Sequence, residues 1–304
     1  MPTPTLLIQA TEEAWKRQKK YTMSYLVTDF NKIRQEKSIL QILEALERGF
    51  VKFDIDFYLV GAVAREVWMR GLKDITPRRA TSDIDFGILI KDSGHFAELK
   101  DYLISKEGFT GYKENAFVLI APDHRQIDIL PFGEIEKEGK VTVKGTGMTT
   151  IFVDGMKEVF EEGVPEVSFE EKITFKVCTL PGIVLLKLIA YDDRPEIRRD
   201  DLIDISDILL HFFNIYDEII WSEHNDLFGD SKSLEKISAR VLGREMGKIL
   251  NRNKKLTQRV IGILSAKGNA KSIAEIMAGT LDKTVDEITE WLQEIIAGIN
   301  ELTL

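Results

Sequence analysis

Residues 79–90 read RATSDIDFGILI, and this stretch decides the architecture of the chain. Side chains alternate along an extended strand, so Asp83 and Asp85 share one face while the apolar residues between and after them share the other. Two carboxylates so placed repel each other unless a cation lies between them, and oxygen ligands suit Mg²⁺ or Mn²⁺. The stretch therefore predicts a strand from about Asp83 to Ile90 that presents a metal site on one face.

A second short segment repeats the pattern. Residues 126–130 read QIDIL, which places Ile127 and Ile129 on one face of a strand and Asp128 on the other. If this strand lies beside the first, the carboxylates of Asp83, Asp85 and Asp128 converge. Three such groups suit a pair of metal ions ~3.5–4 Å apart, which clamp the attacking and leaving oxygens of a phosphoryl transfer.

A glycine follows the strand that precedes both aspartate segments. Residues 58–66 read YLVGAVARE, predicting a strand from Lys52 to Val60, Gly61, and a helix from Ala62 to Gly71. Glycine lets the backbone approach a ligand closely, and a helix N-terminus offers free N–H groups to phosphate. An ordinary strand-to-helix turn has the same sequence, but the three aspartates favour the phosphate-binding interpretation.

The remaining pattern is mixed up to about residue 180 and helical beyond it. Helical spacing covers 11–49 and 96–104, residues 122–125 read as a hairpin turn, and short strands are expected at 116–121, 140–143 and 173–178. Later helices are predicted at 181–191, 200–213, 217–227, 232–250, 255–266, 270–279 and 284–300. We therefore expect an α+β fold with a domain over 1–180 and a helical domain over 181–304.

The order of these motifs resembles the DNA polymerase β-like nucleotidyltransferase superfamily: Leu59-Val60-Gly61, then Asp83-x-Asp85, then Asp128 on a later strand. Within it, residues 79–86 and 126–130 resemble the abortive-infection (AbiEii-type) toxin nucleotidyltransferases. Residues 185–190 (LLKLIA) and 198–204 (RRDDLID) are similar to that family's downstream elements. The likeness spans roughly residues 55 to 215 and implies a mixed sheet flanked by helices.

The resemblance implies transfer of a nucleoside monophosphate from an NTP to a hydroxyl, with release of pyrophosphate. Asp83 and Asp85 would hold two Mg²⁺ (or Mn²⁺) ions, and Asp128 would ligate the catalytic ion and help to deprotonate the acceptor. The remaining residues expected to bind the nucleotide are Gly61, Ala62, Arg65, Arg79, Lys187 and Asp204.

One position departs from the superfamily pattern, because Ala62 stands where Ser or Gly is usual. Three functions remain open. The first is transfer to an RNA or protein hydroxyl in a toxin-like context, with an antitoxin as a partner. The second is transfer to a small molecule, and the third is a catalytically silent nucleotide-binding protein. The place of Lys187 in an otherwise apolar run favours a lysine that extends out of a buried helix, whereas the resemblance favours contact with phosphate.

Charge is segregated along the 304 residues. The formal net charge of −9 argues against a general nucleic-acid coat protein, yet nine Lys or Arg lie between Ser231 and Arg259 against two Glu. Those from Lys232 to Arg252 recur every fourth residue, and such a stripe could track an RNA backbone or be a solvated face. The single cysteine, Cys178, the lack of a secretory pattern and the short apolar runs predict a cytoplasmic protein with no membrane segment.

Overall fold

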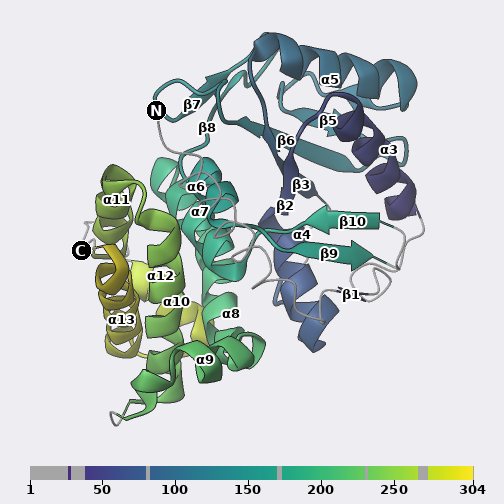
Figure 1. The fold of residues 1–304 in the computed structure, drawn as a ribbon. Coiled ribbons are helices and arrows are strands. Elements are labelled where there is room, and N and C mark those ends of the chain that lie inside the picture. Colours follow the sequence, from purple (N-terminus) through teal and green to yellow (C-terminus); the bar gives the residue numbers. More distant parts are fainter. Residues whose placement is uncertain are drawn as a thin grey trace, which may run out of the picture.

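The computed structural model describes residues 27–28, 38–79, 83–169, 173–229, 232–265 and 273–303. Figure 1 shows a part that carries the strands and, beside it, a part built of helices. None of the helices within these ranges combines the length and the apolar character that a membrane crossing needs.

A five-stranded mixed sheet forms the centre of the first part, in the order β2-β3-β6-β5-β4. β3 and β6 run parallel, and the other neighbouring pairs run antiparallel. The strands are β2 (Phe57–Val60), β3 (Ile84–Leu89), β4 (Thr110–Gly111), β5 (Val118–Ile120) and β6 (Gln126–Phe132). β3 and β6 are adjacent strands inside the sheet, so their side chains lie near the middle of each sheet face.

Two helices, α3 (Ser38–Lys52) and α5 (Ser93–Lys106), pack against each other beside this sheet. The turn before α5 is fixed locally, since the Asp92 side chain accepts hydrogen bonds from the backbone N–H groups of Gly94 and His95. Phe50 of α3 packs against Phe86 of β3, with ring centroids 5.9 Å apart. The isoleucine and phenylalanine face of β3 is therefore the core face, and the aspartate face is left for the site.

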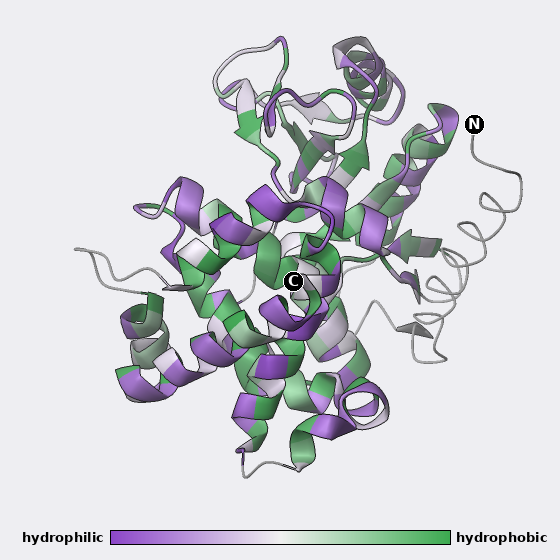
Figure 2. Cartoon of the chain, turned by 60° about the vertical axis from the view of Figure 1, so that its left-hand side comes forward, coloured by the Kyte–Doolittle hydropathy of each residue, from purple (hydrophilic) through white to green (hydrophobic). Residues whose placement is uncertain are grey.

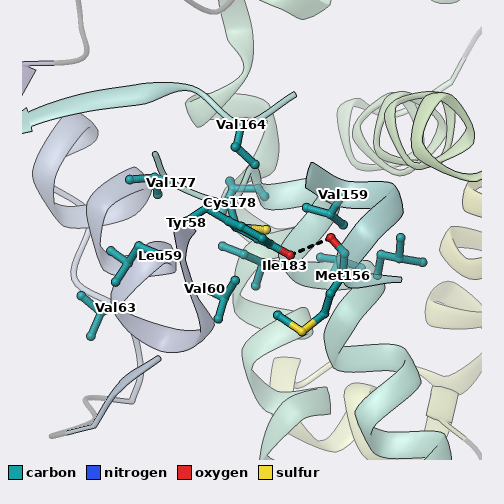
Figure 3. Packing of buried hydrophobic residues seen from close by; sticks show 14 of the residues in the cluster. Tyr58, Leu59, Val60, Val63, Met156, Val159, Val164, Val177, Cys178 and Ile183 are labelled. Carbon is teal, nitrogen blue, oxygen red and sulfur yellow. Dashed lines mark hydrogen bonds between the residues drawn. The ribbon is translucent and has the colours of Figure 1, made fainter. Parts of the chain in front are cut away.

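Two smaller sheets complete the first part. β9 (Glu166–Phe169) pairs with β1 (Val27–Thr28) and with β10 (Ile173–Lys176), and β7 (Lys140–Thr142) forms a hairpin with β8 (Thr150–Phe152). Helix α4 (Gly61–Glu66) starts directly at the end of β2 and continues as the π-helix η1 (Val67–Gly71). Helix α6 (Met156–Glu162) follows the hairpin, and the hydroxyl of Tyr58 on β2 donates to the Met156 carbonyl at 2.9 Å (Figure 3).

From Leu180 onward the described secondary-structure elements are helices. The helices are α7 (Leu180–Asp193), α8 (Arg199–Ile215), α9 (Asp217–Glu223), the 3-10 helix η2 (Asn225–Phe228), α10 (Leu234–Leu250), α11 (Lys254–Ser265), α12 (Ile273–Leu281) and α13 (Val285–Thr303). Figure 2 shows that the helices carry both hydrophobic and hydrophilic residues. α10 and α13 pack closely against each other. A Cβ on Gly243 or Gly298 would overlap the backbone of the facing helix, so glycine at these positions permits the close approach.

The predicted fold class is confirmed: a mixed sheet flanked by helices is followed by a helical C-terminal half. Two local predictions were wrong. Val27–Thr28 is a strand, whereas a helix was expected over 11–49; residues 11–26 and 29–37 of that prediction lie outside the described residues. Helix α3 continues to Lys52, so the predicted strand from Lys52 starts only at Phe57.

Candidate active site

The register of β3 and β6 places two aspartates side by side. Asp85 is the direct neighbour of Asp128 across the parallel pair, and Asp83 lies just before β3. All three residues line one cavity of about 590 Å³. The condition set by the sequence, that the second strand lies beside the first, is therefore met by the observed pairing.

The alternation of β3 explains why the aspartates face the cavity. Ile84, Phe86 and Ile88 are fully buried on the core face, whereas Asp85 is partly accessible on the other. Gly87 shares the face of Asp85, and a Cβ there would lie 2.8 Å from both the Tyr58 ring and the Met156 methyl group. A glycine at this position thus allows β2 and α6 to close over the strand beside the carboxylate.

Gly61 lies directly against the carboxylate of Asp85. Val60 is the register partner of Asp85 on the antiparallel neighbour β2, so the chain turns into α4 immediately beside that side chain. Gly61 has φ +67°, a backbone conformation that L side chains rarely adopt, and a Cβ there would overlap the Asp85 carboxylate. Geometry and contact therefore both require glycine, and both bring the backbone to the edge of the carboxylate pair.

The carboxylate pair lacks enough positive charge for easy ionisation. Burial, reinforced by the negative charges of Asp128 and Asp83, raises the pKa of Asp85 to about 7. Burial also raises the pKa of Asp128, although the Gln126 amide donates a hydrogen bond to its Oδ1 at 2.8 Å and opposes the shift. Two neighbouring acids whose charged forms are disfavoured are the arrangement that a bound cation would stabilise.

Lys187 lies on the cavity wall and is held by two aspartates of α8. Its ammonium group is 2.6 Å from Asp201 Oδ1 and 2.9 Å from Asp204 Oδ2. Burial lowers the pKa of Lys187, but the attraction of these two carboxylates outweighs burial and the net shift is upward. The lysine therefore stays charged inside the cavity, and its charge also lowers the pKa of Asp85.

Arg65 and Arg79 join the same ionic network. The Arg65 side chain is 1% exposed, pairs with Asp204 and donates a hydrogen bond from Nη2 to the Arg79 carbonyl at 2.7 Å. Arg79 in turn contacts Asp200 at 2.7 Å. Asp204 thus links α4 to α7 and α8, so these residues hold the cavity wall together even without a ligand.

Every residue expected to act in the site lines this one cavity: Gly61, Ala62, Arg65, Arg79, Asp83, Asp85, Asp128, Lys187 and Asp204. The structure adds residues that sequence patterns had not assigned to the cavity, chiefly Phe152, Asp154, Asp193 and Ile197. Phe152 ends the three-residue strand β8, and Asp154 lies in the turn between that strand and α6. Such a short strand has too few residues to show a period of two.

The basic stripe is engaged within the chain. Its residues contact acidic side chains, in part across the close α10–α13 interface. The pairs are Lys232–Glu294, Lys236–Glu290, Arg240–Glu294, Arg240–Glu301, Arg244–Glu301, Arg244–Asp226, Lys248–Glu245 and Arg252–Glu162. The stripe therefore provides no open positive track, and its use as support for an RNA acceptor does not hold.

A group of possible metal ligands lies among these helices. Glu223, His224 and Glu245 bring their ligand atoms within 4.8 Å of one another. His224 Nε2 is 3.0 Å from Glu245 Oε1, and the ammonium group of Lys248 contacts both glutamates. Because a lysine already supplies the positive charge, this group is an internal ion cluster that needs no metal.

No protein-family model and no curated protein sequence matches the chain. Among solved structures, the chain is similar to the solution structure of the antibiotic-resistance factor ANT(2'')-Ia. The two are 10% identical, the match covers 64% of this chain and 95% of that chain, and the TM-score is 0.34. So distant a likeness supports no inference, and the function proposed below rests on the geometry of the cavity.

Proposed function

We propose that the protein is a metal-dependent nucleotidyltransferase that moves a nucleoside monophosphate from an NTP to a hydroxyl group. The observation that carries this proposal is the Asp85–Asp128 pair on adjacent parallel strands, with Asp83 on the same cavity and the Gly61 backbone against Asp85. The sequence resemblance stated above is in accord with it.

The donor set fits Mg²⁺ or Mn²⁺, because these hard cations prefer carboxylate oxygens. Asp85 and Asp128 share a register position, and the pKa of each is raised by burial in the absence of a cation. Asp83, Asp85 and Asp128 would hold the metal ions, which would neutralise charge on the phosphates and on the attacking and leaving oxygens. A cation there would return the aspartates to their ionised forms.

The residues of the chain then divide the remaining tasks. Gly61 lets a phosphate approach the backbone beside Asp85, and Lys187 and Arg198 provide positive charge near the aspartates, as their lowering of the Asp85 pKa indicates. The acceptor oxygen bonds to the α-phosphorus while the bond to pyrophosphate breaks. Gln126 donates a hydrogen bond to Oδ1 of Asp128 and so orients the carboxylate that would take the acceptor proton.

The charge of the cavity bears on the acceptor. Eight aspartates line it against five Lys and Arg residues. A triphosphate with its two metal ions adds little net charge, so the surplus remains negative. Together with the internally paired stripe, this negative surplus favours a neutral or positively charged small hydroxyl compound as the acceptor over an RNA backbone. Transfer to such a small molecule is the second candidate function.

The decisive experiment is label transfer from α-³²P-labelled NTPs. Purified protein is incubated with Mg²⁺ and, in separate arms, with total cellular RNA, with cellular protein and with a small-molecule extract. We expect label in one arm and release of pyrophosphate, both lost in Asp85→Asn and in Asp128→Asn. Asp101→Asn, an exposed aspartate of α5, is the matched control. Equal labelling by wild type and Asp85→Asn would refute the proposal.

A further inference from the structure

Phe152 is an exposed aromatic residue among those that line the cavity. The residue is 50% exposed, although it belongs to the cavity wall, and Ile197 on the same wall is 64% exposed. Within the described ranges, these two are the large exposed apolar side chains that line the cavity. An exposed aromatic ring at the wall of a polar cavity is available for contact with a flat ligand group.

The hairpin imposes this exposure on Phe152. Ile151 and Val141 are buried on one face of β7–β8, so alternation places Phe152 on the opposite face. Its register partner is Lys140, whose ammonium group lies 4.9 Å from the ring centroid. The cation covers part of the ring, while half of the side-chain surface remains accessible.

The hairpin is anchored just beyond Phe152. Arg259 Nη1 is 2.7 Å from Asp154 Oδ2, and Arg259 Nη2 is 2.6 Å from Asp193 Oδ1 at the end of α7. The next residue, Gly155, packs so closely on α7 that a Cβ there would lie 2.9 Å from the Ile189 side chain. Phe152 is therefore two residues from a point fixed to α7, the helix that also carries Lys187.

We infer that Phe152 stacks on the base of the NTP, with Ile197 as a second apolar surface. The inference rests on the proposed function, which places the triphosphate at Gly61 and the aspartates. The base of the same nucleotide must then lie elsewhere in the cavity, and Phe152 is the aromatic surface on its wall that is open to solvent. Stacking is tolerant of base identity, because every base has a π-face.

The test separates the base from the phosphates. Calorimetric titration with Mg²⁺ uses an α,β-methylene NTP, which cannot transfer its nucleotide, and inorganic tripolyphosphate as the probe that lacks a base. The proteins are wild type, Phe152→Ala, Phe152→Trp and Trp221→Ala. Trp221 is 55% exposed, stacks on Phe228 and lies outside the residues that line the cavity, so its replacement is a matched control. Melting temperatures confirm that each variant folds.

In Phe152→Ala we expect roughly tenfold weaker binding of the nucleotide analogue and unchanged binding of tripolyphosphate. Phe152→Trp and Trp221→Ala should bind the analogue at least as well as wild type. Unchanged analogue affinity in Phe152→Ala, or an equal loss for both probes, would overturn the inference alone. A wild-type protein that binds neither probe would refute the proposed function itself.

Discussion

The cavity aspartates and the basic stripe are both dense clusters of like charge, but they differ in the charges that surround them in the fold. Arg240 and Arg244 each contact two acidic side chains, and these pairs raise the pKa of both guanidinium groups. Asp85 and Asp128 instead face each other, and burial with their mutual repulsion raises the pKa of Asp85 to about 7. The charges of the stripe are compensated within the fold, whereas the fold disfavours the charged forms of Asp85 and Asp128.

Reversing a charge in the stripe should produce the largest change in stability. Arg244→Glu would replace two partly exposed ion pairs with Asp226 and Glu301 by two repulsions, so we expect a loss of about 2–4 kcal/mol in the free energy of unfolding. Urea denaturation measures it, with Lys254→Glu, an exposed residue of α11, as control. A loss of unfolding free energy equal to that of Lys254→Glu would mean that Asp226 and Glu301 do not compensate the charge of Arg244.

Lys187 tests whether the ionic network of the cavity is structural as well as functional. Lys187→Met keeps the packed stem but removes the cation between Asp201 and Asp204, and we expect a loss of about 3 kcal/mol. Asp204 also pairs with Arg65, so Asp201 is the carboxylate that loses more of its compensating positive charge in this variant. Adding Asp201→Asn should therefore restore part of the stability. A double variant no more stable than Lys187→Met would contradict the inference that Lys187 neutralises Asp201.

Asp85→Asn should stabilise the metal-free protein by about 1–2 kcal/mol at pH 8, because it removes a carboxylate whose charged form the fold disfavours. The folded-state pKa of about 7 lies above the ordinary 3.8, so the folded state binds more protons and wild-type stability falls as pH rises from about 4 to 7. The advantage of the variant should grow over that window and level off above it. Thermal unfolding in EDTA from pH 4 to 8 measures it, and a pH-independent difference would contradict the prediction.

The smallest effect concerns RNA. If the stripe is fully engaged within the chain, Lys232→Ala with Lys236→Ala should leave the salt dependence of binding to a tRNA pool unchanged. Filter binding at several salt concentrations compares the double variant with wild type. A slope lower by about two log–log units would show that both lysines leave their glutamate partners to contact phosphate.

Local sequence was enough for most of the elements and for the three aspartates and the glycine that line the cavity. The alternation around Asp85 and Asp128 predicted both strands and the face on which each aspartate lies, and a glycine after β2 marked the close approach at Gly61. The strands β4, β8 and β9 and helix α6 were not predicted. The prediction that Val27–Thr28 is helical failed because pairing with β9, a contact distant in sequence, decided its conformation.

The sequence by itself determined which side chains alternate, where the backbone can turn and which residue types could bind a cation, because these depend on neighbours within a few positions. Only the tertiary structure decided how distant charges meet. The fourth-residue spacing of the stripe is the same whether its partner is RNA or α13, and only the tertiary structure shows that Glu294 and Glu301 lie opposite Arg240. Likewise, the register of β3 on β6 makes Asp85 and Asp128 neighbours, since strand pairing joins residues that lie far apart along the chain.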